Sequence, residues 1–126
     1  MALIEELAGR AFAARNMAHA KHWRVSGPGS YAAHSALGDF YDALPGKIDE
    51  IIEVYQGAFG LIGDIPEITD EDEGLPLDFA AYLSAEVRWI QANRAAIANG
   101  ITPIENLIDD LMGCYLKTVY KLVNLR

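Results

Sequence analysis

The stretch from His22 to Glu53, HWRVSGPGSYAAHSALGDFYDALPGKIDEIIE, carries the pattern that decides the fold. His22 lies at the end of one helical pattern, and His34 opens the next. Asp49 and Glu53 follow one helical turn apart in that second pattern. Imidazole nitrogens and carboxylate oxygens are good ligands for a hard or borderline metal such as iron. The stretch therefore predicts a metal site carried by two consecutive helices.

The spacing along the second helix limits how such a site can close. Asp49 lies 15 residues after His34 (49 − 34), which is roughly 22 Å along a straight helix at a rise of about 1.5 Å per residue. One chain therefore cannot bring both histidines and both carboxylates to one metal ion. If all four bind one metal, His22 and His34 of one subunit must meet Asp49 and Glu53 of a second, antiparallel copy. A two-fold dimer would form this site twice.

Apolar residues recur at helical spacing in four segments, and the predicted helices span residues 2–25, 31–58 and 77–99 and continue from Thr102 through Val123. Pro45-Gly46 interrupts the second helix, which predicts either a kink or two abutting helices. Asn99-Gly100 predicts the end of the third helix. Thr102, Pro103 and Glu105 predict a capping-box start for the fourth.

Between the second and third helices, residues 57–76 are rich in glycine and proline and contain the acidic run 70–73. We expect a loop here, with a short helix around residues 65–69, long enough to cross from one end of a bundle to the other. The predicted fold class is all-α. It is a ferritin-like four-helix bundle with a long crossover between the second and third helices, in one domain over residues 1–126.

Composition narrows the classes of function. The net charge of -8 favours cations over phosphate backbones, so direct DNA binding is not expected. Cys114 is the only cysteine, which excludes an internal disulfide and favours a cytoplasmic setting. Charged residues near the start break any signal-peptide core, and no apolar run reaches membrane-spanning length. A soluble protein that does not enter a membrane is expected.

Several chemistries have no motif in this sequence. No Glu-x-x-His pair occurs, and the predicted third and fourth helices contain no histidine, so a metal centre inside a single bundle has few ligands. The sequence also lacks a phosphate-binding loop, a dinucleotide-binding glycine pattern and a Gly-x-Ser-x-Gly turn. These absences direct the predicted site to a subunit interface.

The pattern resembles the Dps miniferritins, the dodecameric iron-storage proteins of bacteria. The residues that carry the resemblance are His22-Trp23, Val25, Gly27, Tyr31, His34, Leu37, Phe40, Leu44, Asp49 and Glu53. The chain is also similar to small ferritin-like proteins encoded in phage genomes, through His22-Trp23, His34, Gly38 to Tyr41, Asp49 and Glu53 to Gly57.

The resemblance implies a ferroxidase centre at a two-fold interface. His22 and His34 of one subunit and Asp49 and Glu53 of its mate would bind iron as catalytic residues and metal ligands, with Trp23 packed beside them. Iron would be the cofactor, with zinc as a substitute. The implied activity is oxidation of Fe(II) by hydrogen peroxide or dioxygen, and storage of Fe(III) inside a hollow dodecamer.

The sequence departs from the Dps pattern in three places. Gly38 stands where the family has an aspartate, and Asp42, one turn further on, is the candidate substitute ligand. This predicts a site that binds one iron well and a second poorly. The second departure is Pro45-Gly46, which alters the helix at the expected dimer contact. The third is that the predicted first helix begins close to Met1, without the lysine-rich tail that lets some members bind DNA.

Other side chains have less specific interpretations. We expect His19 at the surface or behind the metal ligands, Glu50 to be exposed or in an interface ion pair, and Cys114 to act as a small core residue. The adjacent Asp109 and Asp110 suit either iron nucleation or a solvated helix face.

Two rival functions stay open. One is a ferritin-fold scaffold or interaction protein, such as a phage-encoded one, whose site is vestigial or holds a structural zinc and which stores no iron. The other is a DNA-binding nucleoid protein, which the net charge of -8 disfavours.

Overall fold

The computed structural model describes residues 2–68 and 78–125 and folds them into four helices. They are α1 (Leu3–Arg24), α2 (Ser30–Phe59), α3 (Phe79–Ala98) and α4 (Thr102–Asn124). Helices are the only regular secondary structure within these two described ranges, which confirms the all-α prediction. The acidic run 70–73 and the predicted start of the third helix at residue 77 lie outside the described residues.

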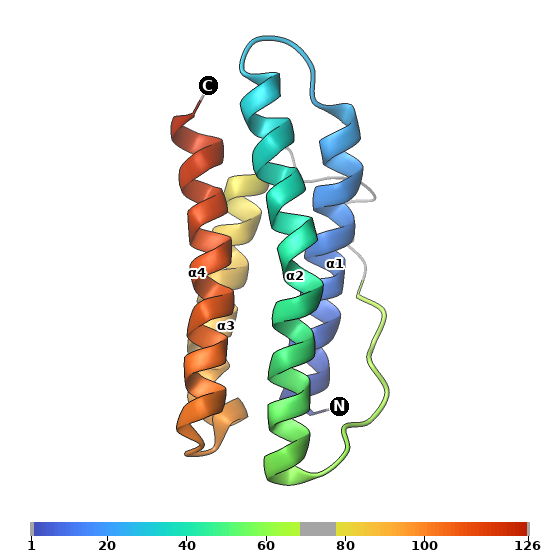
Figure 1. Cartoon of the computed structure of the whole chain (residues 1–126), viewed down its shortest axis with the longest axis vertical. Coiled ribbons are helices and arrows are strands. Elements are labelled where there is room, and N and C mark those ends of the chain that lie inside the picture. Colours follow the sequence, from blue (N-terminus) through green and yellow to red (C-terminus); the bar gives the residue numbers. More distant parts are fainter. Residues whose placement is uncertain (1, 69–77, 126) are drawn as a thin grey trace.

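The helices lie side by side as a bundle (Figure 1). Around it the order is α1, α2, α4, α3, because α1 packs on α2, α2 on α4, α4 on α3 and α3 on α1. α1 runs in one direction along the bundle, and α2 and α3 both run in the opposite direction. α4 then runs in the same direction as α1 (Figure 1). Each helix is therefore antiparallel to the neighbours it packs against, and α2 and α3 are diagonal and parallel.

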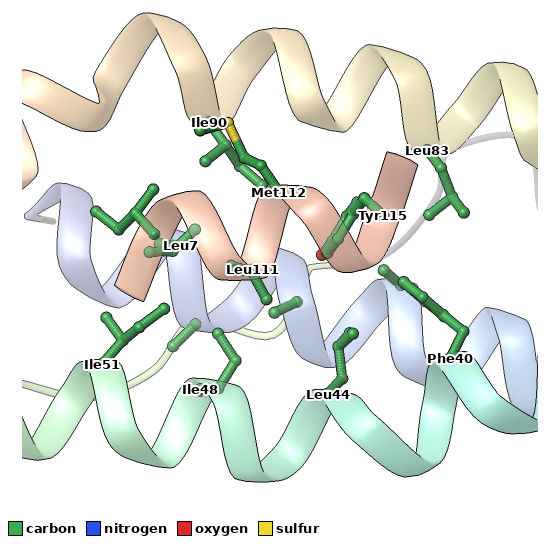
Figure 2. Close-up of a cluster of buried hydrophobic side chains, with 14 of the residues drawn as sticks. Leu7, Phe40, Leu44, Ile48, Ile51, Leu83, Ile90, Leu111, Met112 and Tyr115 are labelled. Carbon is green, nitrogen blue, oxygen red and sulfur yellow. The ribbon is translucent and has the colours of Figure 1, made fainter. Parts of the chain in front are cut away.

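Apolar side chains of all four helices fill the space between them (Figure 2). The largest of the fully buried ones include Leu7 of α1, Phe40, Leu44 and Ile51 of α2, Leu83 and Ile90 of α3, and Leu111 and Tyr115 of α4. Phe40 and Tyr115 meet edge to face with ring centroids 5.1 Å apart, a favourable arrangement for aromatic pairs. Burial raises the pKa of the Tyr115 phenol well above its usual value. This core fixes the register of α2 against α4.

A tight turn joins α1 to α2 and determines where the two histidines lie. Gly27 and Gly29 have φ of 87° and 79°, a region that side chains with a Cβ rarely adopt. The Ser30 amide donates a hydrogen bond to the Gly27 carbonyl at 3.1 Å. The chain reverses within these few residues, so the last turn of α1 faces the first turns of α2.

α2 continues through Pro45 as one helix of 30 residues. The alternative of two abutting helices is therefore wrong. Proline removes one backbone donor from the helix, but Leu44 and Ile48 on either side of it are buried in the core and hold the helix in place.

The ends of the later helices agree with prediction in part. Asn99 ends α3 in the left-handed conformation, at φ 47°, as the sequence predicts. The capping box predicted at Thr102 is wrong, because Ile101 holds the cap position and no side chain caps α4. Thr102 is already helical, and Glu105 pairs with Arg94 of α3 at 3.1 Å instead of reaching back to the helix start.

Beyond α2, residues 61–68 run back along the bundle without regular structure (Figure 1). The short helix expected around 65–69 is therefore absent from its described part, residues 65–68. A Cβ on Gly9 of α1 would lie 2.7 Å from the Pro66 carbonyl oxygen, so glycine allows the segment to approach α1. The Gly63 amide donates to the buried Glu5 carboxylate at 2.8 Å. These contacts hold the segment against α1.

None of the helices in the described ranges combines the length and the apolar character needed to cross a membrane.

Candidate metal centre

The two histidines singled out by the sequence lie against each other at one end of the bundle. His22 comes from the last turn of α1 and His34 from the start of α2, and the glycine turn between the helices brings them together. Their rings stack with centroids 3.6 Å apart and an interplanar angle of 21°. His22 and His34 therefore lie in one cluster within a single chain.

Two hydrogen bonds hold this pair reciprocally. The distance from His22 Nδ1 to the His34 carbonyl oxygen is 2.8 Å, and that from His34 Nδ1 to the His22 carbonyl oxygen is 2.9 Å. A carbonyl oxygen can only accept, so each Nδ1 must carry the proton and donate it. In the neutral imidazoles each Nε2 then has its lone pair free. Metal-binding histidines are commonly oriented in this way, with the second ring nitrogen donating to a backbone carbonyl.

Gly38 packs against this pair. A Cβ built on Gly38 would lie 3.3 Å from His22 Cε1 and 3.5 Å from His22 Nδ1. The position where the Dps pattern has an aspartate is thus next to the His22 ring. Asp39, the next residue, extends toward α4 and pairs with Lys121 at 3.4 Å, and Asp42 is exposed.

The carboxylates predicted as ligands lie further along α2. Asp49 and Glu53 are both exposed and neither pairs with another described side chain. They border a groove of about 200 Å³ whose other lining residues are apolar: Ala8 and Phe12 of α1, Ile48 and Ile52 of α2, and Ile62 and Ile65 of the following segment. Among the described residues of a single chain, no three metal-ligating side chains gather in one place.

Aromatic rings surround the histidine pair. His19 stacks on Tyr41, with centroids 4.1 Å apart and an interplanar angle of 16°, and its centroid lies 4.4 Å from that of Trp23. Tyr41 also meets His22 edge-on at 5.2 Å. Trp23 is 71% exposed. The sequence analysis did not assign Tyr41 a role, although Tyr41 lies two helical turns after His34 and so on the same face of α2.

The remaining candidates have ordinary structural partners. Arg94 binds Asp109 through two nitrogens, at 2.6 and 2.8 Å, and these hydrogen bonds lower the pKa of Asp109. Asp110 pairs with Lys47 of α2 at 2.7 Å. Both aspartates thus bridge helices at the surface. Cys114 packs against the core, where burial raises the pKa of its thiol.

The sequence analysis missed a partly buried ion pair between α1 and α3. Arg10 of α1 donates to Glu86 of α3 at 2.9 Å and to Glu6 at 2.8 Å, and its guanidinium lies 4.2 Å above the centre of the Trp89 ring. Burial raises the pKa of Glu86, while Arg10 opposes this effect. Arg10 therefore joins α1 to α3, the pair of neighbouring helices on the far side from α2 and α4.

Comparison with known proteins gives a family but no function. The model of the family DUF5856, described as a family of unknown function, matches residues 22–122. The chain belongs to this family. No curated protein and no solved structure matches it. The matched DUF5856 region begins at His22 and includes His34, Tyr41, Asp49 and Glu53.

Proposed function

We propose that this DUF5856 protein is a miniferritin similar to the Dps proteins. It binds Fe(II) between two subunits, oxidises it with hydrogen peroxide or dioxygen, and stores Fe(III) inside a hollow oligomer. The observation that carries the proposal is the reciprocal hydrogen bonding of His22 and His34. In the neutral form of each ring, the Nδ1 hydrogen bond leaves the Nε2 lone pair free to bind a metal. One ring must turn out of the stacked arrangement before both lone pairs meet at the same ion.

The other ligands come from a second copy. His22 and His34 offer two nitrogen donors, and no further metal-ligating side chain joins them among the described residues of one chain. Asp49 and Glu53 are exposed and without ion-pair partners in the same described part. Placing two copies antiparallel along α1 and α2 brings each carboxylate pair to the partner's histidine pair. One two-fold axis then generates two identical sites.

The surface that such a dimer would bury is complementary to itself. The last turn of α1 carries Lys21 and Arg24 in addition to His22, and Trp23 projects from it. The opposite end of the same face carries an apolar groove bordered by Asp49 and Glu53. A basic end with an exposed tryptophan thus faces an acidic, apolar groove when the copies are antiparallel. Large aromatic side chains in such positions are the usual centres of binding energy in interfaces.

The chain path fits the same class of protein. α2 and α3 run parallel on opposite corners of the bundle, and residues 60–68 start back along its length (Figure 1). Bundles with one long crossover of this kind include the ferritin-like folds. We therefore interpret the connection between α2 and α3 as the ferritin-like crossover, in the cytoplasmic setting expected from the single cysteine.

The residues have distinct roles in this reaction. His22 and His34 bind Fe(II) through neutral nitrogens. Asp49 and Glu53 of the mate neutralise its charge and favour Fe(III), because hard oxygen donors prefer the higher oxidation state. Gly38 offers no carboxylate, and Asp42 lies exposed one turn away. We infer a site with one well-held iron.

A second candidate function uses the same two nitrogen donors. Paired histidines with free Nε2 atoms also suit Zn²⁺, so the site could hold a structural zinc at an interface of a scaffold protein that stores no iron. The two functions differ in what happens when one ligand is removed. A structural metal is needed for assembly, whereas a substrate metal is needed only for oxidation.

The test is to follow ferric product formation by the purified protein with dioxygen and with peroxide, and to measure particle mass by light scattering on the same sample. We expect rapid oxidation in a particle of about twelve subunits. His34→Ala should slow oxidation by about 100-fold or more, since even residues behind metal ligands contribute about 10- to 100-fold. Its particle mass should not change.

Glu50→Gln is the matched control. Glu50 is an exposed carboxylate next to Asp49 on α2 but turned about 100° around the helix, so its loss should leave oxidation intact. No oxidation above buffer by the unmodified protein would overturn the proposal. Loss of assembly in His34→Ala with zinc bound would favour the scaffold instead.

A further inference from the structure

A cleft of about 450 Å³ lies between α2 and α4, and all of its lining residues come from these two helices. Phe40 and Thr118 are its buried lining residues, and the Thr118 hydroxyl donates to the Cys114 carbonyl at 2.9 Å. Ala43 has a short side chain and Gly113 has none, so the space stays open. A Cβ on Gly113 would meet no atom within 4 Å. The volume lies within the range of about 300 to 1,000 Å³ that small-molecule sites occupy.

Two ion pairs link the helices along this α2–α4 cleft. Lys47 pairs with Asp110 at 2.7 Å, and Lys121 pairs with Asp39 at 3.4 Å. Asp39 and Lys47 are 8 residues apart on α2 (47 − 39), or about 12 Å, so the two pairs lie at different levels of the cleft. The side chains of Asp110 and Asp39 are 60% and 70% exposed, whereas those of Lys47 and Lys121 are 29% and 26% exposed. The lysine stems thus cover apolar surface in the cleft, while both carboxylates extend into solvent.

A third lysine gives the cleft an excess of positive charge. Lys117 lies on α4 between Asp110 and Lys121, is exposed, and forms no ion pair with another described residue. Three ammonium groups and two carboxylates give the cleft a net charge of +1 (3 − 2), in a chain whose net charge is -8. The Cys114 thiol responds to this charge: burial raises its pKa, all three lysines oppose the rise, and Asp110 adds to it. The cleft is therefore a cationic part of an acidic protein.

We propose that the α2–α4 cleft binds a small organic molecule with an apolar body and one anionic group, such as a carboxylate or a sulfonate. The body contacts Phe40, Ala43 and Gly113, and the anionic group pairs with Lys117. A molecule with several negative charges is repelled by the two exposed carboxylates, so a single charge matches the single unpaired ammonium. A metal cation is disfavoured, because both carboxylates already pair with lysines. This binding does not depend on the proposed ferroxidase function.

The test uses anilinonaphthalene sulfonate, a fluorescent molecule with apolar rings and one sulfonate, and the whole chain without iron. Its affinity is measured by fluorescence titration of the unmodified protein and three variants. Lys117→Met removes the charge and keeps an unbranched apolar side chain. Gly113→Leu fills the cleft, and α4 tolerates it because the new Cβ has open space. Arg88→Met is the matched control, since Arg88 is an exposed cation on α3 and its loss changes the net charge equally.

Alkylation of Cys114 by iodoacetamide gives a second readout from the same cleft, because Cys114 is the only cysteine. We expect the bound dye to slow this alkylation severalfold. Lys117→Met should weaken dye binding by about 5-fold, the upper end for an exposed ion pair. Gly113→Leu should abolish binding, and Arg88→Met should leave it unchanged.

The proposal is overturned if the unmodified protein does not bind the dye, or if Lys117→Met and Arg88→Met bind it equally well. It is also overturned if Gly113→Leu keeps the affinity, or if the bound dye leaves the alkylation of Cys114 unchanged. The last two results would place the dye on another surface of the protein.

Discussion

The two ends of the α1–α2 face differ in how complete they are. At the histidine end, the chain itself holds His22 and His34 through reciprocal hydrogen bonds and ring stacking. At the carboxylate end, Asp49 and Glu53 lie exposed beside an apolar groove, without ion-pair partners among the described residues. One end is organised before any partner arrives. The other has the features of a surface whose neighbours belong to another molecule.

The most direct test of this difference removes the carboxylates in one variant and a histidine in another, and then mixes the two variants. The change Asp49→Asn with Glu53→Gln should reduce iron oxidation by about 100-fold or more, as should His22→Ala, because each removes metal ligands from every site. A sample in which both variants are unfolded and refolded together should recover about a quarter of the normal rate. Half of random dimers are mixed, and in each of these one of the two sites has all its native ligands.

Rates of ferric product formation before and after mixing provide the measurement. Mixing His22→Ala with His34→Ala is the control, because no combination of these two chains contains an intact histidine pair. Recovery in the control, or none in the first mixture, would show that the four residues do not form one site across two subunits.

A second prediction concerns the exposed tryptophan at the histidine end. If Trp23 enters the partner's groove, Trp23→Ala should weaken dimerisation by about 2 kcal/mol or more, roughly 30-fold in the dissociation constant. Sedimentation over a range of concentrations measures this. Tyr120→Ala is the control, because Tyr120 is also a large exposed aromatic residue but lies on α4. Equal effects of the two changes would place the dimer contact elsewhere.

The sequence was sufficient to predict the features that depend on the period of apolar residues and on distance along a helix. The helix bounds agree within two residues where both ends are described, because apolar residues at helical spacing must share a face. The conclusion that His34 and Asp49 are too far apart for one ion needed only the rise of a helix. Both arguments use the backbone alone.

The features that could not be predicted from the sequence depend on side-chain rotamers and on contacts between helices. The start of α4 was misread because Thr102 is already helical and Ile101 holds the cap position, while Glu105 pairs with Arg94 of another helix. The stack of His19 on Tyr41 and the packing of Gly38 on His22 depend on the separation of α1 and α2 and on the rotamers at their contact. Spacing along one helix does not determine either. Residues that share a face with a candidate ligand, such as Tyr41, are nevertheless worth examining as its neighbours.

The smallest expected effect is that of replacing two glycines of α2 by alanine. It measures how firmly the His22 ring is held in its position. Alanine at Gly46, whose Cβ would meet no atom within 4 Å, should raise the free energy of unfolding by about 0.5 to 1 kcal/mol, since glycine is unfavourable inside a helix. Alanine at Gly38 should stabilise less, because its Cβ would lie 3.3 Å from the hydrogen-bonded His22 ring.

The same pair of substitutions also separates stability from metal binding. The Gly38→Ala change must move the His22 ring by a few tenths of an ångström, so we expect the affinity for Fe(II) to fall severalfold while Gly46→Ala keeps it. Chemical denaturation and anaerobic Fe(II) titration provide the two measurements. If both variants gain the same stability and bind iron equally well, the His22 ring has room to shift. The histidine end would then be as adaptable as the carboxylate end, and the difference between the two ends would lie only in their hydrogen bonds.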